Sequence, residues 1–216
     1  MSAGFDDPRG TWNKRFSAEG FLFGLEPNRW LAEHADVWKP GDRVLAVADG
    51  EGRNSVWLAK RSLQVDAFDI SDVGVAKARR LAAEQGVAVD FAVADVAELA
   101  WPDGLYDGVA AIFLQFADPA LRARIFAGIV RCLKPGGTLV LQGYTPRQLE
   151  FRTGGPPIAS HLYTPQLLRD AFAALEILEL RDYEAVIEEG TGHNGPSALI
   201  GLVARRTTPP SSPGKP

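Results

Sequence analysis

The chain is poor in the residue that small cross-linked and metal-bound domains depend on. Its 216 residues include a single cysteine, Cys132. No intrachain disulfide and no cysteine-based metal cluster can therefore form. A free cysteine usually fills a small buried space, and we interpret Cys132 in that way. We expect no metal site and no reactive thiol.

Long apolar stretches and runs of basic residues are also missing. No stretch approaches the roughly 20 residues that a membrane-spanning helix needs, and the first ten residues contain no apolar core of a secretory signal. Lysine and arginine total 23 against 27 acidic residues, and no run of basic residues exceeds two. Nucleic-acid binding usually needs a basic patch. We predict a cytoplasmic protein, a monomer or weak homodimer, with no nucleic-acid or membrane partner.

The most informative segment is Arg43–Ile70, which has the pattern strand, glycine turn, helix, strand. Arg43–Ala48 is an apolar run typical of a parallel strand buried on both faces. The turn Asp49–Gly52 contains two glycines, which let the backbone approach a ligand closely. A second strand, Gln64–Phe68, ends at Asp69, where a carboxylate can accept hydrogen bonds from a ribose diol. These features predict a nucleoside site at the carboxyl edge of a parallel sheet.

Two nucleoside cofactors compete for this site. The dinucleotide fingerprint requires a third glycine, but Gly50-x-Gly52 is followed by Arg53, Asn54 and Ser55. The acidic turn is also unfavourable for a pyrophosphate. A cationic cofactor without phosphates fits better, which favours S-adenosylmethionine. A dinucleotide-dependent oxidoreductase remains the alternative.

Further alternating strands and helices follow along the chain. Ser71, Asp118-Pro119 and Thr164-Pro165 each have the pattern of a helix start. The predicted later strands are Asp90–Val96, Tyr106–Leu114, Leu133–Gln142, Glu176–Glu188 and Ser197–Arg206.

The segments VLAVADGEGRNSVWLA and LKPGG together resemble the class I S-adenosylmethionine-dependent methyltransferases. WNKRF, FGLEPNRWLAEHA, YTP and TGGPP are similar to a small bacterial branch related to tellurite-resistance methyltransferases. The resemblance covers Trp12 to about Arg206. It implies an α/β fold: a single doubly wound, Rossmann-like domain with a seven-stranded, mostly parallel sheet, an antiparallel last strand and helices on both faces.

We expect residues 1–10 to be a disordered N-terminus and 207–216 a disordered tail. Residues 11–206 are predicted to form the methyltransferase domain, with an N-terminal cap or lid at 11–38 and a Rossmann-like core at 43–206. Within the cap, Pro27 should open a helix, and Phe21–Gly24 should form a flap over the cofactor.

The resemblance assigns the cofactor site to strand ends and the glycine turn. Asp69 is expected to hold the ribose, and the acidic-apolar pair that ends the third strand is expected to contact the adenine. The predicted S-adenosylmethionine-binding residues are Ala48, Asp49, Gly50, Gly52, Asn54, Asp69, Ile70, Asp95, Val96 and Phe113.

One position departs from the family pattern. Where the family usually has an acid, this chain has Ala46, which cannot hold the amino group of the cofactor. Either Asp49 replaces that acid from the turn, or Asp49 only caps the following helix. The departure also leaves a non-catalytic S-adenosylmethionine-binding protein as an alternative function.

We expect the acceptor pocket to be bounded by three loops at the carboxyl edge, 115–119, 143–163 and 190–196. His193 is the candidate catalytic base, because histidine titrates near neutral pH. The acceptor is expected to be a small nucleophile, namely a thiol, a chalcogen oxyanion or a small metabolite, with S-adenosylhomocysteine as the other product. The candidate pocket residues are Phe23, Gln115, Tyr144, His161 and His193.

Overall fold

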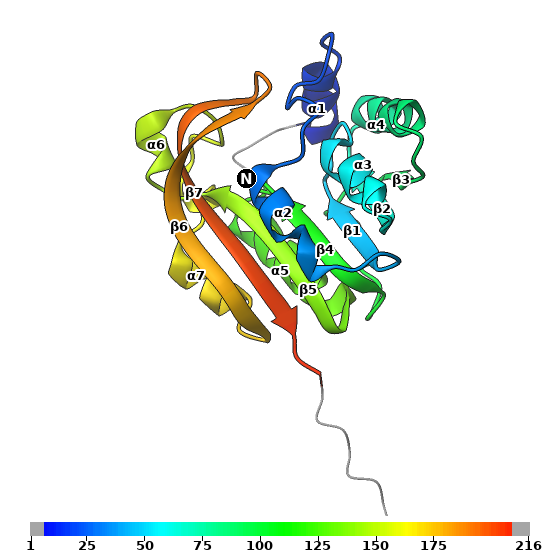
Figure 1. The fold of residues 1–216 in the computed structure, drawn as a ribbon. Helices are drawn as coiled ribbons and strands as arrows, with labels where there is room; N and C mark the ends of the chain where they lie inside the picture. The colour runs from blue at the N-terminus through cyan, green and yellow to red at the C-terminus, as the bar shows by residue number, and fades with distance from the viewer. Residues whose placement is uncertain (1–6, 209–216) are drawn as a thin grey trace, which may run out of the picture.

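The computed structural model describes residues 7–208, which form one seven-stranded sheet in the order β3-β2-β1-β4-β5-β7-β6 (Figure 1). The first five strands pair in parallel, and β7 runs antiparallel to both β5 and β6. This confirms the fold class predicted from the sequence. The strands are β1 (Arg43–Val47), β2 (Gln64–Asp69), β3 (Asp90–Val93), β4 (Tyr106–Ile112), β5 (Leu133–Tyr144), β6 (Leu175–Glu189) and β7 (His193–Arg206).

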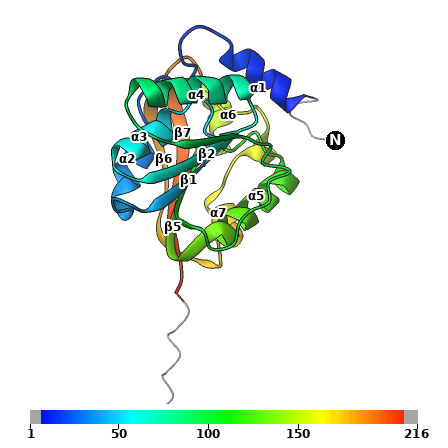
Figure 2. The same ribbon diagram turned by 90° about the vertical axis from the view of Figure 1, so that its right-hand side faces the viewer.

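Helices cover both faces of the sheet (Figure 2). On one face lie α2, α3 and α4, and on the other lie α5 and α7. Helix α1 and the short helix α6 lie near the carboxyl ends of the parallel strands (Figure 1). The helices are α1 (Pro8–Phe16), α2 (Arg29–His34), α3 (Arg53–Lys60), α4 (Asp72–Glu84), α5 (Pro119–Cys132), α6 (Gln148–Phe151) and α7 (Pro165–Ala171).

Strand alternation divides the core into two layers. In β1, Val44 and Ala46 point into the layer under α2, α3 and α4, whereas Leu45 and Val47 point into the layer under α5 and α7. A strand buried on both faces needs this continuous apolar run, because neither set of side chains faces water. Packing on both faces therefore fixes the position of the last residues of β1. It also fixes the position of the glycine turn that follows them at the carboxyl edge.

The predicted helix starts at Ser71, Asp118 and Thr164 are confirmed. Each side chain accepts a hydrogen bond from the backbone N–H three residues later, at 3.0, 2.8 and 3.1 Å. Each therefore satisfies one of the free N–H groups at the start of its helix.

Two expectations about the N-terminal segment need correction. Helix α2 begins at Arg29 rather than at Pro27, because Asn28 is its N-cap and accepts from Leu31 N–H. Residues 1–6 lie outside the described chain, but α1 begins at Pro8, within the segment expected to be disordered. Asp7 caps α1 by accepting from Gly10 N–H at 2.9 Å, and Pro8 fits its first turn.

The glycine-rich segment near the C-terminus is shorter as a loop than predicted. We expected a loop over 190–196, but β7 already starts at His193, which pairs with Glu189 of β6. Residues 190–192 form the turn, and the N–H groups of Thr191 and Gly192 donate to the carbonyl of Leu22. The tip of the hairpin therefore contacts the N-terminal segment, and the β6–β7 pairing continues to Glu189 and His193.

Other boundaries differ less. Strand β3 ends at Val93, three residues earlier than expected, and residues 209–216 of the predicted tail lie outside the described chain. Within residues 7–208, none of the helices has the length and apolar composition required to cross a membrane.

Candidate functional site

The glycine turn connects β1 to α3 at the carboxyl edge of the sheet. Gly50 and Gly52 have φ values of +65° and +92°, in the left-handed region that glycine tolerates. A Cβ on Gly52 would lie 2.7 Å from the Cβ of Ala78, so this glycine also permits α3 to pack against α4. The turn therefore keeps its backbone close to the sheet edge.

Asp69 holds this turn from the end of β2. Its carboxylate accepts hydrogen bonds from the N–H groups of Gly50 and Ser71, both at 2.9 Å. Burial raises the pKa of Asp69 to about 6. Each carboxylate oxygen has more than one acceptor direction, so Asp69 can still accept from a ligand hydroxyl. The Phe16 ring of α1 packs over Gly50 and covers this region.

Asp49 is hydrogen-bonded to the helix that follows it. Its carboxylate accepts from both the backbone N–H and the hydroxyl of Ser55 in the first turn of α3. Burial raises the pKa of Asp49 to about 7. Of the two roles expected for Asp49, the contacts are those of a helix cap, while Ala46 is a buried core residue.

Two non-glycine residues at strand ends have left-handed backbones. Ala48 follows β1 with φ +49°, and Phe113 follows β4 with φ +55°. Such conformations are costly for residues with a Cβ and occur often at ligand sites. Ala48 and Asp49 line a cavity of about 10 Å³ between these strand ends, together with Ala46, Val47, Asn54, Ala110 and Ile112.

The residues expected near an adenine lie beside Asp69. Ala94 N–H donates to the Asp69 carbonyl at 3.0 Å, which ties the turn after β3 to the end of β2. In that turn Asp95 is half-buried and accepts from Ala97 N–H, and Val96 is buried in the core. Ile70 is half-buried directly after Asp69. The structure therefore brings the predicted cofactor residues to one edge.

An aromatic cluster lies at the same edge. The His193 ring centroid is 4.6 Å from that of Phe23, 4.5 Å from Phe113 and 5.6 Å from Tyr144. Three of the predicted pocket residues, Phe23, Tyr144 and His193, are thus in one cluster with the predicted cofactor residue Phe113.

Gln115 and His161 are placed differently. The Gln115 amide accepts from the N–H of Tyr144 and donates to its carbonyl, which fixes the loop after β4 to the end of β5. The His161 ring bonds to the Gln115 carbonyl at 3.0 Å. Both side chains are buried, and these hydrogen bonds give them a structural role in holding the two loops together.

A buried ion pair supports His193. Glu189 accepts from Arg53 at 2.7 Å and lies 3.3 Å from Nδ1 of His193. Although burial opposes ionisation, the hydrogen bond from His193 and the charge of Arg53 lower the pKa of Glu189 to about 2. Burial lowers the pKa of His193 below its ordinary 6.5. An ionised Glu189 therefore accepts the Nδ1 proton of a neutral His193, and Nε2 is left as a proton acceptor.

Asn28 extends this network to the N-terminal segment. Its Nδ2 donates to Glu189 and to Gln142, and its backbone N–H donates to Asn54 at 2.9 Å. Gln142 in turn donates to the hydroxyl of Tyr183. Sequence reasoning did not select Asn28, Arg53, Gln142, Tyr183 or Glu189. A polar residue within the apolar run of β5 was the available signal for Gln142.

Comparisons with known proteins show that this chain is similar to methyltransferases. A family model described as a methyltransferase domain matches residues 44–137. A ubiquinone biosynthesis O-methyltransferase of Xanthomonas campestris is 37% identical over 123 residues, covering 56% of this chain and 50% of that protein. A demethylmenaquinone methyltransferase of Thermus thermophilus is 33% identical over 122 residues, covering 55% of each. The chain thus spans about half the length of the curated relatives it matches.

Solved structures share the fold over most of the chain. TehB from Haemophilus influenzae aligns with a TM-score of 0.69 at 15% identity, covering 92% of this chain and 67% of that one. The N-methyltransferase NodS from Bradyrhizobium japonicum, in complex with S-adenosyl-L-homocysteine, aligns with a TM-score of 0.68 at 13% identity, covering 93% and 99%. At these identities the alignments establish the shared fold.

The buried ion pair generates the first prediction. Glu189→Gln keeps the side-chain shape but leaves Arg53 uncompensated, so unfolding free energy should fall by about 3 kcal/mol. Glu176→Gln, also on β6, breaks the exposed pair with Arg205 of β7 and should cost less than about 1 kcal/mol. Chemical denaturation of both variants measures the difference. Equal losses would show that the buried pair contributes no more than the exposed one.

The second prediction concerns Asp49 and pH. Its folded pKa of about 7 exceeds the ordinary 3.8, so the folded state holds the proton more tightly than the unfolded state. Stability from this group is therefore present at low pH and is lost as pH rises from about 4 to about 7. The unfolding free energy of the wild type, minus that of Asp49→Asn, should fall by more than about 1 kcal/mol over this range. A constant difference would contradict the buried placement of Asp49.

Proposed function

Residues 44–137 of this chain are a methyltransferase domain of the class I S-adenosylmethionine-dependent family, and on that premise we propose that the chain transfers a methyl group to a small-molecule nucleophile. The observation that carries the proposal is the carboxyl edge itself, where Gly50, Asp69 and Asp95 are brought together. The resemblance predicted from the sequence is confirmed for the family and the fold.

The residues present fit the cofactor. Asp69 would accept from the ribose hydroxyls, and Asp95 and Val96 would contact the adenine. Gly50 and Gly52 would lie beside the methionine part, near the small cavity at Asp49. When bound, S-adenosylmethionine supplies a methyl group already activated by its sulfonium. Helix α1 and the loop at 21–24 would form the cap, since Phe16 packs over Gly50.

The chain's own contribution is to hold the acceptor and exclude water. The ring cluster of Phe23, Phe113 and Tyr144 forms an apolar wall around His193. Positioning of a nucleophile can lower a barrier by roughly 7–11 kcal/mol, so a strong catalytic motif is not required. His193, kept neutral by burial and oriented by Glu189, would accept a proton from an acceptor that arrives protonated.

The proposed acceptor is small, namely a thiol, a chalcogen oxyanion or a small metabolite. The rings of Phe23, Phe113 and Tyr144 surround His193 at centroid distances of 4.5–5.6 Å, which suits a small molecule better than a macromolecule. Cytoplasmic location, a monomeric or weakly dimeric state and the absence of a nucleic-acid partner remain predictions.

A second candidate function is cofactor binding without catalysis. Ala46 provides no acid for the amino group of the cofactor, and the Asp49 carboxylate is already bonded to Ser55. Such a protein would bind S-adenosylmethionine but form no S-adenosylhomocysteine with any acceptor. The match to a methyltransferase domain gives no support to the dinucleotide alternative.

Calorimetry with S-adenosylhomocysteine tests the cofactor assignment. Asp69→Ala removes a carboxylate that would accept hydrogen bonds from the ribose hydroxyls. The affinity for S-adenosylhomocysteine should therefore fall about ten- to a hundredfold. Asp66→Ala is the matched control, because Asp66 lies on the same strand and binds Arg43 away from the edge. Unchanged affinity in Asp69→Ala would remove Asp69 from the site, and no binding by the wild type would reject the proposed function.

Turnover tests His193. With the best acceptor from a screen of thiols, tellurite, selenite and hydroxylated metabolites, His193→Ala should lose at least about tenfold in kcat while S-adenosylhomocysteine affinity holds. The wild-type rate should rise with pH through an inflection below 6.5, since the base must be neutral, and the variant should lack it. His34→Ala is the control, as His34 contacts Trp30 and Glu179 instead. Identical pH profiles in wild type and His193→Ala would assign His193 a structural role.

A further inference from the structure

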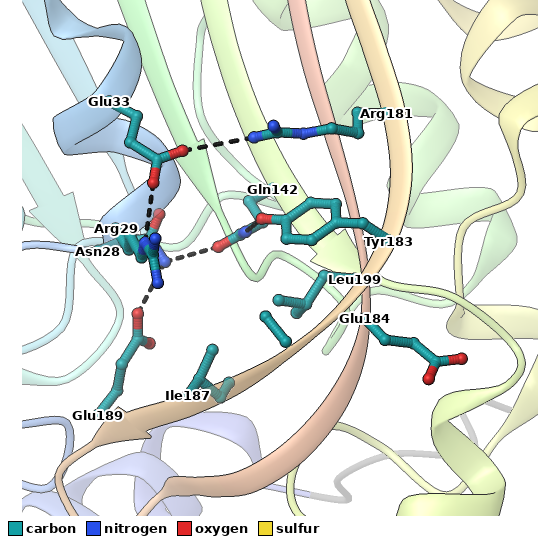
Figure 3. A pocket seen from close by; sticks show the side chains of 11 residues that line it. Asn28, Arg29, Glu33, Gln142, Arg181, Tyr183, Glu184, Ile187, Glu189 and Leu199 are labelled. Carbon is teal, nitrogen blue, oxygen red and sulfur yellow. Dashed lines mark hydrogen bonds and ion pairs between the residues drawn. The ribbon is translucent and has the colours of Figure 1, made fainter.

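A cavity of about 250 Å³ lies between α2 and the β6–β7 hairpin (Figure 3). It lies on the sheet face that α2 covers, and the loops 115–119 and 143–163 do not line it. Its lining therefore differs from that of the predicted acceptor pocket. The two are neighbours, because Glu189 lines the cavity, and Ile187 and Leu199 pack in one cluster with Tyr144. The lining residues are Asn28, Arg29, Glu33, Gln142, Arg181, Tyr183, Glu184, Ala185, Ile187, Glu189 and Leu199.

The charges around this cavity are already paired. At its mouth, Glu33 binds both Arg29 and Arg181, and Glu184 binds Arg147. At its floor, Glu189 is paired with Arg53. A ligand anion would be repelled by the three carboxylates that line the cavity, and a ligand cation would be repelled by its two guanidinium groups. The electrostatics favour an uncharged ligand.

The Tyr183 hydroxyl offers the cavity a hydrogen-bond donor. Both Nδ2 protons of Asn28 are used by Glu189 and Gln142. Tyr183 accepts from Gln142 at 2.6 Å, and within residues 7–208 its hydroxyl has no other hydrogen bond. Burial raises the pKa of Tyr183 to about 12, so the hydroxyl keeps its proton and can donate a hydrogen bond. In Figure 3 the Tyr183 hydroxyl lies beside Gln142, next to the cavity.

The remaining wall is aliphatic. Ile187 and Leu199 are buried side chains of β6 and β7 that line the cavity, and Ala185 adds only a methyl group. In Figure 3, Ile187 and Leu199 lie on the side of the cavity away from Glu33. The volume is below the roughly 300–1,000 Å³ of drug-sized pockets, which suits a single ring or short chain.

We propose that this cavity is a second binding site, for a small uncharged molecule with an apolar ring or chain and one oxygen that accepts a hydrogen bond. The oxygen binds the Tyr183 hydroxyl, and the apolar body packs against Ile187 and Leu199. The site goes beyond the proposed methyl transfer, because it is distinct from the carboxyl edge where the cofactor is assigned.

Acetophenone, α-methylstyrene and benzoate are matched probes for this site. The first has a ring and a carbonyl oxygen, the second replaces that oxygen with a carbon, and the third adds a negative charge. Amide chemical-shift titration of the full chain should show acetophenone binding at least fivefold more tightly than either of the others. Tyr183→Phe keeps the ring but removes the donor, so it should abolish the preference over α-methylstyrene. Equal affinity of the three probes for the wild type would overturn the assigned ligand chemistry.

Two neighbouring substitutions locate the binding. Ala185→Trp fills the cavity and should abolish the acetophenone shifts. Val186→Trp is the control, because Val186 points to the opposite face of β6, is 62% exposed and should leave the affinity unchanged. Retained binding in Ala185→Trp, with its fold confirmed by the spectrum, would place the probe elsewhere and reject the proposal.

Acetophenone binding in saturating S-adenosylhomocysteine tests the second site independently of the proposed function. Acetophenone should bind within twofold of its original affinity when the cofactor product is present. Displacement of acetophenone would show that the cavity belongs to the cofactor site and would overturn the second site. If S-adenosylhomocysteine itself failed to bind, the proposed function would fail while the three-probe comparison still decided this inference.

Discussion

The buried ion pair of Arg53 and Glu189 is the contact on which the arrangement of the site depends. Arg53 begins the helix after the glycine turn, and Glu189 ends β6, so the pair joins segments that lie 136 residues apart. Isolated charges are costly inside a protein, so each side chain needs the other. The hairpin must therefore close over α3, and Asn28 adds the N-terminal segment to the same contact.

Several other features follow from that closure. The N–H groups of the hairpin turn donate hydrogen bonds to the carbonyl of Leu22, and the ring of Phe23 packs against His193. Glu189 fixes the proton of His193 on Nδ1, which gives a histidine in a strand a defined acceptor nitrogen. On the other side of the same carboxylate lies the cavity at Tyr183. One buried charge thus organises both the proposed base and the proposed second site.

Asp69 has the corresponding role at the other end of the edge. Its carboxylate joins the glycine turn to the start of α4, so the loop conformation and the proposed ribose position depend on the same side chain. Burial raises its pKa and that of Asp49, which means that two acids at this edge are held at a cost in stability near neutral pH. Acids retained at such a cost are frequent at functional sites.

Local patterns in the sequence determined the alternation of strands and helices along the chain, the helix caps at Ser71, Asp118 and Thr164, the glycine turn Asp49–Gly52 and the strand end at Asp69. These depend on the backbone and on near neighbours, so periodicity and turn chemistry are sufficient to predict them. Only the tertiary structure decided that His193 is a strand residue, that Gln115 and His161 bind backbone groups, and that Asn28, Arg53 and Glu189 meet. Their partners lie tens to more than a hundred residues away, and burial of a charge or an amide is set by packing between segments that no local pattern records.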